Sequence, residues 1–87
     1  EQWIRILGPR IVKLDIKEYS RKKQVDEGLW KGFQVEITEG DCNWSEVRKA
    51  LADIGYTQGW ATAEVKGGDR QRLQDISERM DRALDLA

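Results

Sequence analysis

Histidine is absent from this sequence of 87 residues, and cysteine and proline each occur only once. A metal site without histidine must be built from carboxylates and other oxygen ligands, which favours Mg²⁺ or Mn²⁺ over zinc. The single cysteine, Cys42, excludes an internal disulfide framework and fits a reducing compartment. We therefore expect a cytoplasmic protein whose cofactor, if it has one, is a divalent metal held by oxygen.

The sequence also lacks an excess of charge and a long apolar run. Its 15 basic and 16 acidic residues give a formal net charge of −1. This balance gives no electrostatic reason to expect nucleic acid or an anionic membrane as partner. No apolar run approaches the roughly 18 residues that a membrane helix needs. Residues 1–87 therefore form a single small globular segment with little core to spare.

Residues 10–17 predict a first strand, because aliphatic and β-branched residues follow the turn signal Gly8-Pro9. Successive side chains of a strand point to opposite faces, so Val12, Leu14 and Ile16 share one face. The opposite face becomes charged toward the carboxyl end of the strand, with Ile11, Lys13, Asp15 and Lys17. Such a face contacts either water or a functional site.

Residues 60–66 repeat the pattern and predict a second strand. Its apolar face carries Ala61, Ala63 and Val65. Glu64 lies on the other face near the carboxyl end, together with Trp60, Thr62 and Lys66. Two strands that each carry an acid near the carboxyl end, each followed by a helix, predict a site at the strand ends of a parallel sheet.

Three further segments are predicted to be helical. Residues 1–7 are typical of the end of a helix that stops at Gly8. Asn43 and Asp69 are typical N-caps of two longer helices. The apolar faces of these two helices are expected to contain Trp44, Val47, Leu51 and Ile54 in one, and Leu73, Ile76, Met80 and Leu84 in the other.

The connection over residues 18–42 is unusually long for a compact domain, which indicates a functional lid or a disordered segment. It is polar at first. Phe33, Val35 and Ile37 then alternate with polar residues, which is compatible with a short additional strand.

Alternation of strands and helices predicts an α/β fold with a parallel sheet. Parallel sheets are almost always buried on both faces, and two strands with these helices cannot achieve this alone. We therefore expect the chain to be part of a larger β/α fold. A beginning on the end of a helix leads to the same expectation.

Three groups of residues carry a resemblance to a known family: Leu7 to Glu18, then Glu39-Gly40-Asp41 with Trp44, then Ile54-Gly55-Tyr56 with Gly59 to Val65. Together they resemble the C-terminal quarter of the sugar phosphate isomerase/epimerase family. This family of xylose-isomerase-like TIM barrels includes hydroxypyruvate isomerases and tagatose or psicose 3-epimerases. The resemblance covers nearly the whole chain. It implies the C-terminal (βα)₂ segment of a TIM (β/α)₈ barrel, with the two strands as the seventh and eighth.

The resemblance also implies a chemistry and a set of site residues. Such enzymes bind Mn²⁺ or Mg²⁺ and move a proton next to the carbonyl of a small sugar or sugar phosphate through an enediolate. Glu64 matches the metal ligand on the last strand. Asp15 stands where the family usually has a histidine ligand, and Arg21 is the nearest match to a basic residue that contacts substrate. Lys13 and Lys17 are candidates for binding a substrate anion.

Each of these candidates has a simpler interpretation beside the functional one. Glu64 is also compatible with a surface acid on an edge strand. Asp15, flanked by Lys13 and Lys17, is compatible with an ion-pair ladder on a solvated face, and the two lysines with neutralising it. Arg21 begins a short basic run that is compatible with a solvated loop.

Other features also have two interpretations. Gly67-Gly68 before a helix is compatible with a phosphate cradle near Arg70, or with a plain turn capped by Asp69. Trp30 and Phe33 would cover the sugar or anchor their loop. Cys42 lacks a histidine partner, so we expect no nucleophilic role for it. The tryptophans at positions 3, 44 and 60 are expected in the core.

Two other functions remain open at the level of the sequence. One is a non-catalytic small α/β interaction module that completes its sheet by self-association. The other is a different TIM-barrel lyase or endonuclease of the same superfamily, because one scaffold hosts several chemistries. For the isomerase we expect the isolated chain to be inactive, since the other metal ligands lie on earlier strands. The chain would then need the rest of the barrel as its partner.

Overall fold

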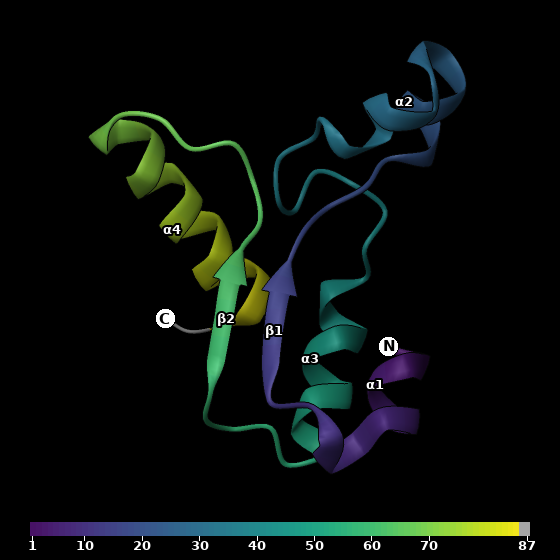
Figure 1. The fold of residues 1–87 in the computed structure, drawn as a ribbon, viewed down its shortest axis with the longest axis vertical. Coiled ribbons are helices and arrows are strands. Elements are labelled where there is room, and N and C mark those ends of the chain that lie inside the picture. Colours follow the sequence, from purple (N-terminus) through teal and green to yellow (C-terminus); the bar gives the residue numbers. More distant parts are fainter. Residues whose placement is uncertain (86–87) are drawn as a thin grey trace.

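Two adjacent parallel strands, β1 (Lys13–Ile16) and β2 (Trp60–Ala63), lie at the centre of the computed structural model, which describes residues 1–85 (Figure 1). Lys13 pairs with Trp60 and Ile16 with Ala63. The predicted α/β class with parallel strands is confirmed. Both strands are shorter than predicted. The chain before β1 turns through the 3₁₀ helix Gly8–Arg10, and the chain beyond Ala63 leaves β1 soon after the N–H of Glu64 donates to the carbonyl of Ile16 at 2.8 Å.

Four α-helices are present in residues 1–85: α1 (Gln2–Leu7), α2 (Arg21–Glu27), α3 (Trp44–Asp53) and α4 (Arg70–Leu84). The predicted caps are confirmed. The side chain of Asn43 accepts from the N–H of Glu46, and that of Asp69 accepts from the N–H of Arg72. Gly8 ends α1 at φ 53°, a value that favours glycine. α1 packs against α3, and α3 against α4.

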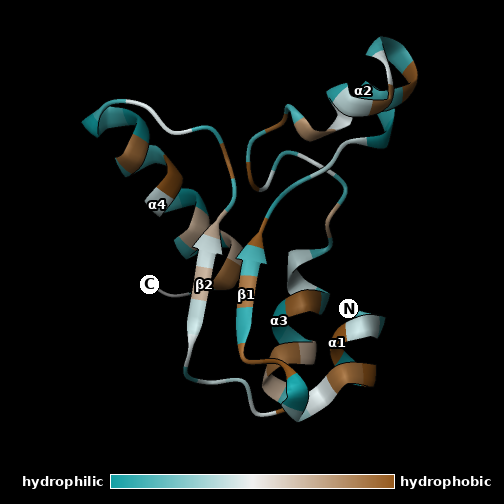
Figure 2. Cartoon of the chain, in the orientation of Figure 1, coloured by the Kyte–Doolittle hydropathy of each residue, from teal (hydrophilic) through white to brown (hydrophobic). Residues whose placement is uncertain are grey.

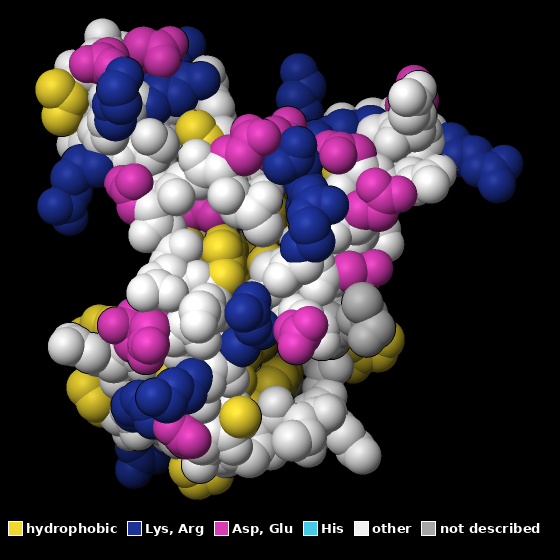
Figure 3. All heavy atoms as spheres, turned by 180° about the vertical axis from the view of Figure 1, so that it is seen from behind, with side chains coloured by type: hydrophobic (Ala, Val, Ile, Leu, Met, Phe, Trp, Pro, Cys, Tyr) yellow, Lys and Arg dark blue, Asp and Glu magenta, His cyan; other side chains and the backbone are white. Residues whose placement is uncertain are grey.

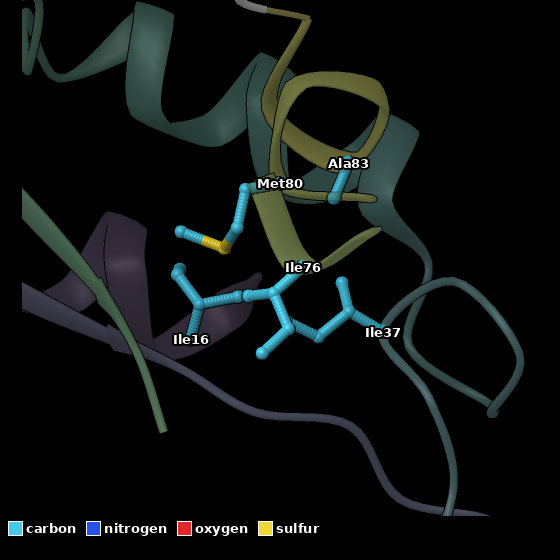
Figure 4. Packing of buried hydrophobic residues seen from close by; sticks show 5 residues of the cluster. All are labelled: Ile16, Ile37, Ile76, Met80 and Ala83. Atoms are coloured by element: carbon cyan, nitrogen blue, oxygen red, sulfur yellow. The ribbon is translucent and has the colours of Figure 1, made fainter. Parts of the chain in front are cut away.

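The core lies on one face of the sheet. Its main cluster of buried side chains comes from β1, the loop before α3, and α4, and contains Ile16, Ile37, Ile76, Met80 and Ala83 (Figure 4). Ala50 and the predicted Leu51 of α3 are also buried. Leu14, Ala61 and Ala63 from the same face of the sheet pack against the main cluster, as does Trp44 at the start of α3. The expected apolar face of the strands is therefore the face that contacts the helices, and β1 alternates in hydropathy along its length (Figure 2).

The connection from β1 to α3 differs from the prediction. Residues 20–33, which we call the arm, form α2 and a 3₁₀ helix, Leu29–Phe33, that packs against it. Residues 34–42, which we call the strap, run back to α3 without forming a strand, so the short strand expected at residues 33–37 is wrong. The backbone donors are engaged elsewhere: the N–H of Gln34 donates to the carbonyl of Lys31, and that of Thr38 to the carboxylate of Glu18.

Two tryptophans expected in the core lie on the surface. Trp60, which pairs with Lys13 in the sheet, is 77% exposed because its side chain lies on the face that carries no helix. Trp3 is 72% exposed on α1, a helix without a buried side chain. Leu73 in the first turns of α4 is also exposed, so the apolar face of α4 begins at Ile76.

None of the helices formed by residues 1–85 combines the length and apolar character that crossing a membrane would require. On the face shown in Figure 3, acidic and basic side chains are interspersed, without a large area of one sign.

Candidate functional site

A cleft of about 710 Å³ opens at the carboxyl ends of the two strands, between the strap and the segment that follows β2. We call it the strand-end cleft. Its charged lining includes Lys17, Glu64, Lys66, Glu36, Glu39 and Arg72. The cleft therefore lies where the sequence predicts a site, at the carboxyl edge of a parallel sheet.

Lys17 and Glu64, both predicted as site residues, meet in this cleft. The ammonium of Lys17 donates to the backbone carbonyl of Glu64 at 3.2 Å and lies 5.3 Å from the centroid of the Phe33 ring. Within the described part of the chain, the carboxylate of Glu64 makes no hydrogen bond or ion pair. This carboxylate is therefore available to a ligand in the cleft.

A second cleft of about 390 Å³ lies between the arm and the strap, and Lys17 and Phe33 line both clefts. Arg21, the third predicted site residue found here, lines this second cleft together with Asp41. The backbone N–H of Arg21 donates to the carboxylate of Asp41 at 2.6 Å. Lys17 therefore lies between the two clefts. It contacts Glu64 in the strand-end cleft, and it also lines the second cleft, where Arg21 lies.

Lys13 and Asp15 lie elsewhere, on the open face of the sheet, and line neither cleft. Their side chains form an ion pair of 3.5 Å between Nζ and Oδ1, and both are more than half exposed. At Asp15 the structure therefore shows the ion pair that the sequence offered as the simpler interpretation.

An ionic network holds Glu36 and Glu39, the two acids of the strap that line the strand-end cleft. Arg72 contacts Glu36 at 2.8 Å and Asp75 at 3.1 Å, and Arg79 contacts Asp75 at 3.0 Å and Glu39 at 3.4 Å. The hydrogen bond from Arg79 lowers the pKa of Asp75, and the same bond raises the pKa of Arg79. Glu36 and Glu39 therefore have arginine partners, whereas Glu64 does not.

The donor set for a divalent metal is incomplete. No group of three or more candidate metal-ligating side chains occurs in residues 1–85. Glu64 fits the role of a single carboxylate ligand, since Mg²⁺ and Mn²⁺ prefer oxygen. The residues described here would therefore contribute to a metal site without completing one.

The glycine pair before α4 leads into a helix whose end is covered by the chain itself. Asp69 caps the helix, and the side chain of Arg72 donates from Nε to the carbonyl of Lys66 at 3.2 Å. A Cβ at Gly68 would lie 2.9 Å from the side chain of Arg72. The approach to this helix end is therefore occupied by the chain's own arginine.

The aromatic residues of the arm contact one another and the neighbouring Tyr19. Phe33 packs edge-on against Tyr19 at 4.6 Å between ring centroids, and Trp30 stacks on Phe33 at 6.3 Å. Trp30 itself is 76% exposed. Phe33 thus fits the expectation of an anchor for the loop, whereas the outer face of Trp30 remains open to solvent.

Sequence reasoning missed Glu18, which is 2% exposed. One carboxylate oxygen accepts from the backbone N–H groups of Tyr19 and Cys42, at 3.2 and 3.0 Å. The other accepts from the N–H of Thr38 at 3.1 Å and from the indole of Trp44 at 2.7 Å. The signal was in the alternation of the first strand, because position 18 continues the inward face of Leu14 and Ile16.

Burial raises the pKa of the Cys42 thiol, and the nearby Glu18 carboxylate raises it further. A raised pKa disfavours the reactive thiolate. The reactive thiolate form of Cys42 is therefore disfavoured in this environment.

Comparisons with protein-family models, with curated proteins and with solved structures found no match for this chain. The functional argument therefore depends on the chain's own residues and geometry.

Proposed function

We propose that this chain supplies the last two βα units of a divalent-metal-dependent sugar or sugar-phosphate isomerase or epimerase. The arrangement of the sheet supports this assignment. Two neighbouring parallel strands have helices on the apolar face only, and the opposite face carries Lys13, Asp15 and Thr62. In a TIM barrel the helices surround the strands, and the active site lies at their carboxyl ends.

The observation that carries the proposal is the meeting of Lys17 and Glu64 in the strand-end cleft. Their contact is made by the Lys17 ammonium and the backbone carbonyl of Glu64, so the Glu64 carboxylate stays available. A cation held beside an unpaired carboxylate suits a substrate that carries hydroxyl, carbonyl or phosphate oxygens. The cleft volume of about 710 Å³ lies in the range of small-molecule sites.

Each residue has a defined role in this proposal. Glu64 provides one carboxylate ligand, and a bound Mn²⁺ or Mg²⁺ supplies polarisation of the substrate oxygens. Lys17 and Arg21 bind the substrate oxygens from the two sides of Phe33. Lys13 and Asp15 lie on the face that would point into the barrel. The remaining ligands and the acid–base groups would come from the other strands.

Manganese binding by the polypeptide as it occurs in its source tests the proposal. Its intact mass should be that of a whole barrel, about 250 residues or more. Mn²⁺ binding is then measured by electron paramagnetic resonance, and solvent deuterium incorporation into candidate ketoses and aldoses by NMR. Glu64→Gln should weaken binding and abolish incorporation, whereas the control Glu78→Gln, on the exposed surface of α4, should change neither. Unchanged binding and incorporation in Glu64→Gln would refute the proposal.

A specific observation favours a second candidate function, a non-catalytic module that self-associates. Large apolar side chains are exposed on α1, among them Trp3 and Ile6, and at the amino ends of the strands, where Val12 and Trp60 lie. A second copy would cover them and extend the open sheet. An intact mass equal to that of the 87 residues, together with a molar mass that rises with concentration in light scattering, would favour this function over the isomerase.

A further inference from the structure

We propose that Glu18 is a positioning residue that fixes the strap and thereby sets the shape of both clefts. The inference rests on the proposed function only for the chemistry that takes place in the strand-end cleft. The positioning itself follows from the contacts of one buried carboxylate. The Glu18 carboxylate makes no hydrogen bond to a side chain that is proposed to bind substrate. It acts through the segments that it holds in place.

The contacts of Glu18 join three parts of the chain. Glu18 is the second residue after β1. The donors to its carboxylate come from Tyr19, from the strap at Thr38 and Cys42, and from Trp44 of α3. A buried carboxylate is tolerated only when its oxygens are satisfied, and here each accepts two hydrogen bonds. Removing the charge would leave several buried donors poorly paired, so the strap and the end of β1 depend on the same side chain.

Gly40 provides a second, independent observation. A Cβ at this position would lie 2.6 Å from one carboxylate oxygen of Glu18 and would also collide with the backbone carbonyl of Tyr19. The N–H of the next residue, Asp41, donates to that carbonyl at 2.7 Å. The strap therefore approaches the end of β1 as closely as it does only because residue 40 has no side chain.

The strap in turn forms a wall of each cleft. Glu36 and Glu39 line the strand-end cleft, and Asp41 and Cys42 line the cleft beside the arm. Ile37 lies in the core and Arg79 donates to its carbonyl at 3.2 Å, and neither contact involves Glu18. Loss of the Glu18 carboxylate should therefore open residues 38–42 locally and leave the sheet intact.

Site-resolved amide hydrogen exchange of the full chain tests this role. Glu18→Gln keeps the size of the side chain but replaces an accepting oxygen with an amide group, which cannot accept from the surrounding N–H groups. We expect exchange at Thr38 and Cys42 to rise by about 10- to 100-fold, as for loss of hydrogen bonds to a charged group. The Glu64 N–H, bonded to Ile16 in the sheet, should keep its rate. The control Glu78→Gln removes an exposed carboxylate of α4 and should leave both sites unchanged.

A spectroscopic signature distinguishes positioning from general stability. The indole N–H of Trp44 donates to Glu18 at 2.7 Å, and its NMR resonance in Glu18→Gln should move toward those of the exposed Trp3 and Trp60. Gly40→Ala should produce the same strap-limited exchange by pushing the strap away, which keeps the test available should Glu18→Gln fail to fold.

Two results would overturn the inference. One is unchanged exchange at Thr38 and Cys42 in a folded Glu18→Gln chain or, where that chain does not fold, in Gly40→Ala. The other is an equal rise at these sites and at the Glu64 N–H, because this would mean general loss of stability. Strap-limited exchange in Glu18→Gln, together with no Mn²⁺ binding by the whole polypeptide from its source, would retain this inference and refute the proposed function, so the two failures are distinguishable.

Discussion

The arm and the strap are consecutive parts of one connection, yet they are held in opposite ways. The strap places Ile37 in the core and bonds to Glu18, two residues after β1, and to Arg79 of α4. The arm packs mainly against itself, because α2 contacts the 3₁₀ helix Leu29–Phe33. Its bonds to the strap are made near its base, by the N–H of Arg21 and the ammonium of Lys23.

The difference shows which half of the connection belongs to the fold. The strap shares buried contacts with the strand and the helices, so its position depends on the core. The arm exposes apolar side chains such as Val25 and Trp30, so little of its surface stabilises the rest. Three substitutions test this contrast, in descending order of expected effect on the free energy of unfolding.

Ile37→Ala should have the largest effect. Ile37 is 1% exposed and packs between β1 and α4 (Figure 4). Truncation leaves a cavity that costs about 2–5 kcal/mol of unfolding free energy. Urea denaturation followed by circular dichroism measures the loss, with the half-buried Val35→Ala as control. A loss no larger than that of the control would show that the strap is not part of the core.

Arg79→Met should have an intermediate effect. It removes the bonds to Asp75, Glu39 and the carbonyl of Ile37, which are partly exposed, so we expect a loss of about 1 kcal/mol. Arg70→Met, on the exposed start of α4, is the control.

The effect of Arg79→Met should depend on pH. Arg79 holds the pKa of Asp75 below its ordinary value of 3.8, so the folded state is favoured above that value and loses this advantage as the pH falls through the lower, folded-state pKa. The difference in stability between the variant and the parent chain should therefore shrink in acid. A difference that stays constant down to the acid limit would show that the Asp75 pair does not contribute.

Trp30→Ser should have the smallest effect. The side chain is largely exposed and stacks only on Phe33 within the arm. We expect a change below about 0.5 kcal/mol, as for surface substitutions away from buried features. The same denaturation curves provide the measurement. A loss comparable to that of Ile37→Ala would mean that the arm, like the strap, supports the core.

The sequence allowed prediction of the features that depend on local chemistry. The caps at Asn43 and Asp69 and the stop at Gly8 are confirmed, because each satisfies backbone groups within one turn. Strand alternation placed Leu14 and Ile16 on the face that packs against helices. It also placed Lys17 and Glu64 at the carboxyl end of the sheet, where the cleft lies.

Features that depend on distant partners could not be predicted. Phe33, Val35 and Ile37 alternate like a strand, but only the tertiary structure shows that Ile37 enters the core alone. Glu18 lies inside because donors 20 to 26 positions further along the chain surround it. An acid is ordinarily an exposed residue, so alternation alone, although it places position 18 on the inward face, was not enough to predict a buried carboxylate.

The two ends of the arm meet, and this has a consequence for engineering. The N–H of Ser20 donates to the carbonyl of Gly32 at 2.8 Å, so the chain leaves and returns at nearly the same point. Changing the length of such a loop costs little, about 0.6 kcal/mol for each doubling. Residues 22–31 thus form a replaceable segment, whereas Arg21, which bonds to Asp41 of the strap, is kept. A short turn or a foreign domain could take their place, with the chain re-entering the strap at an unchanged position.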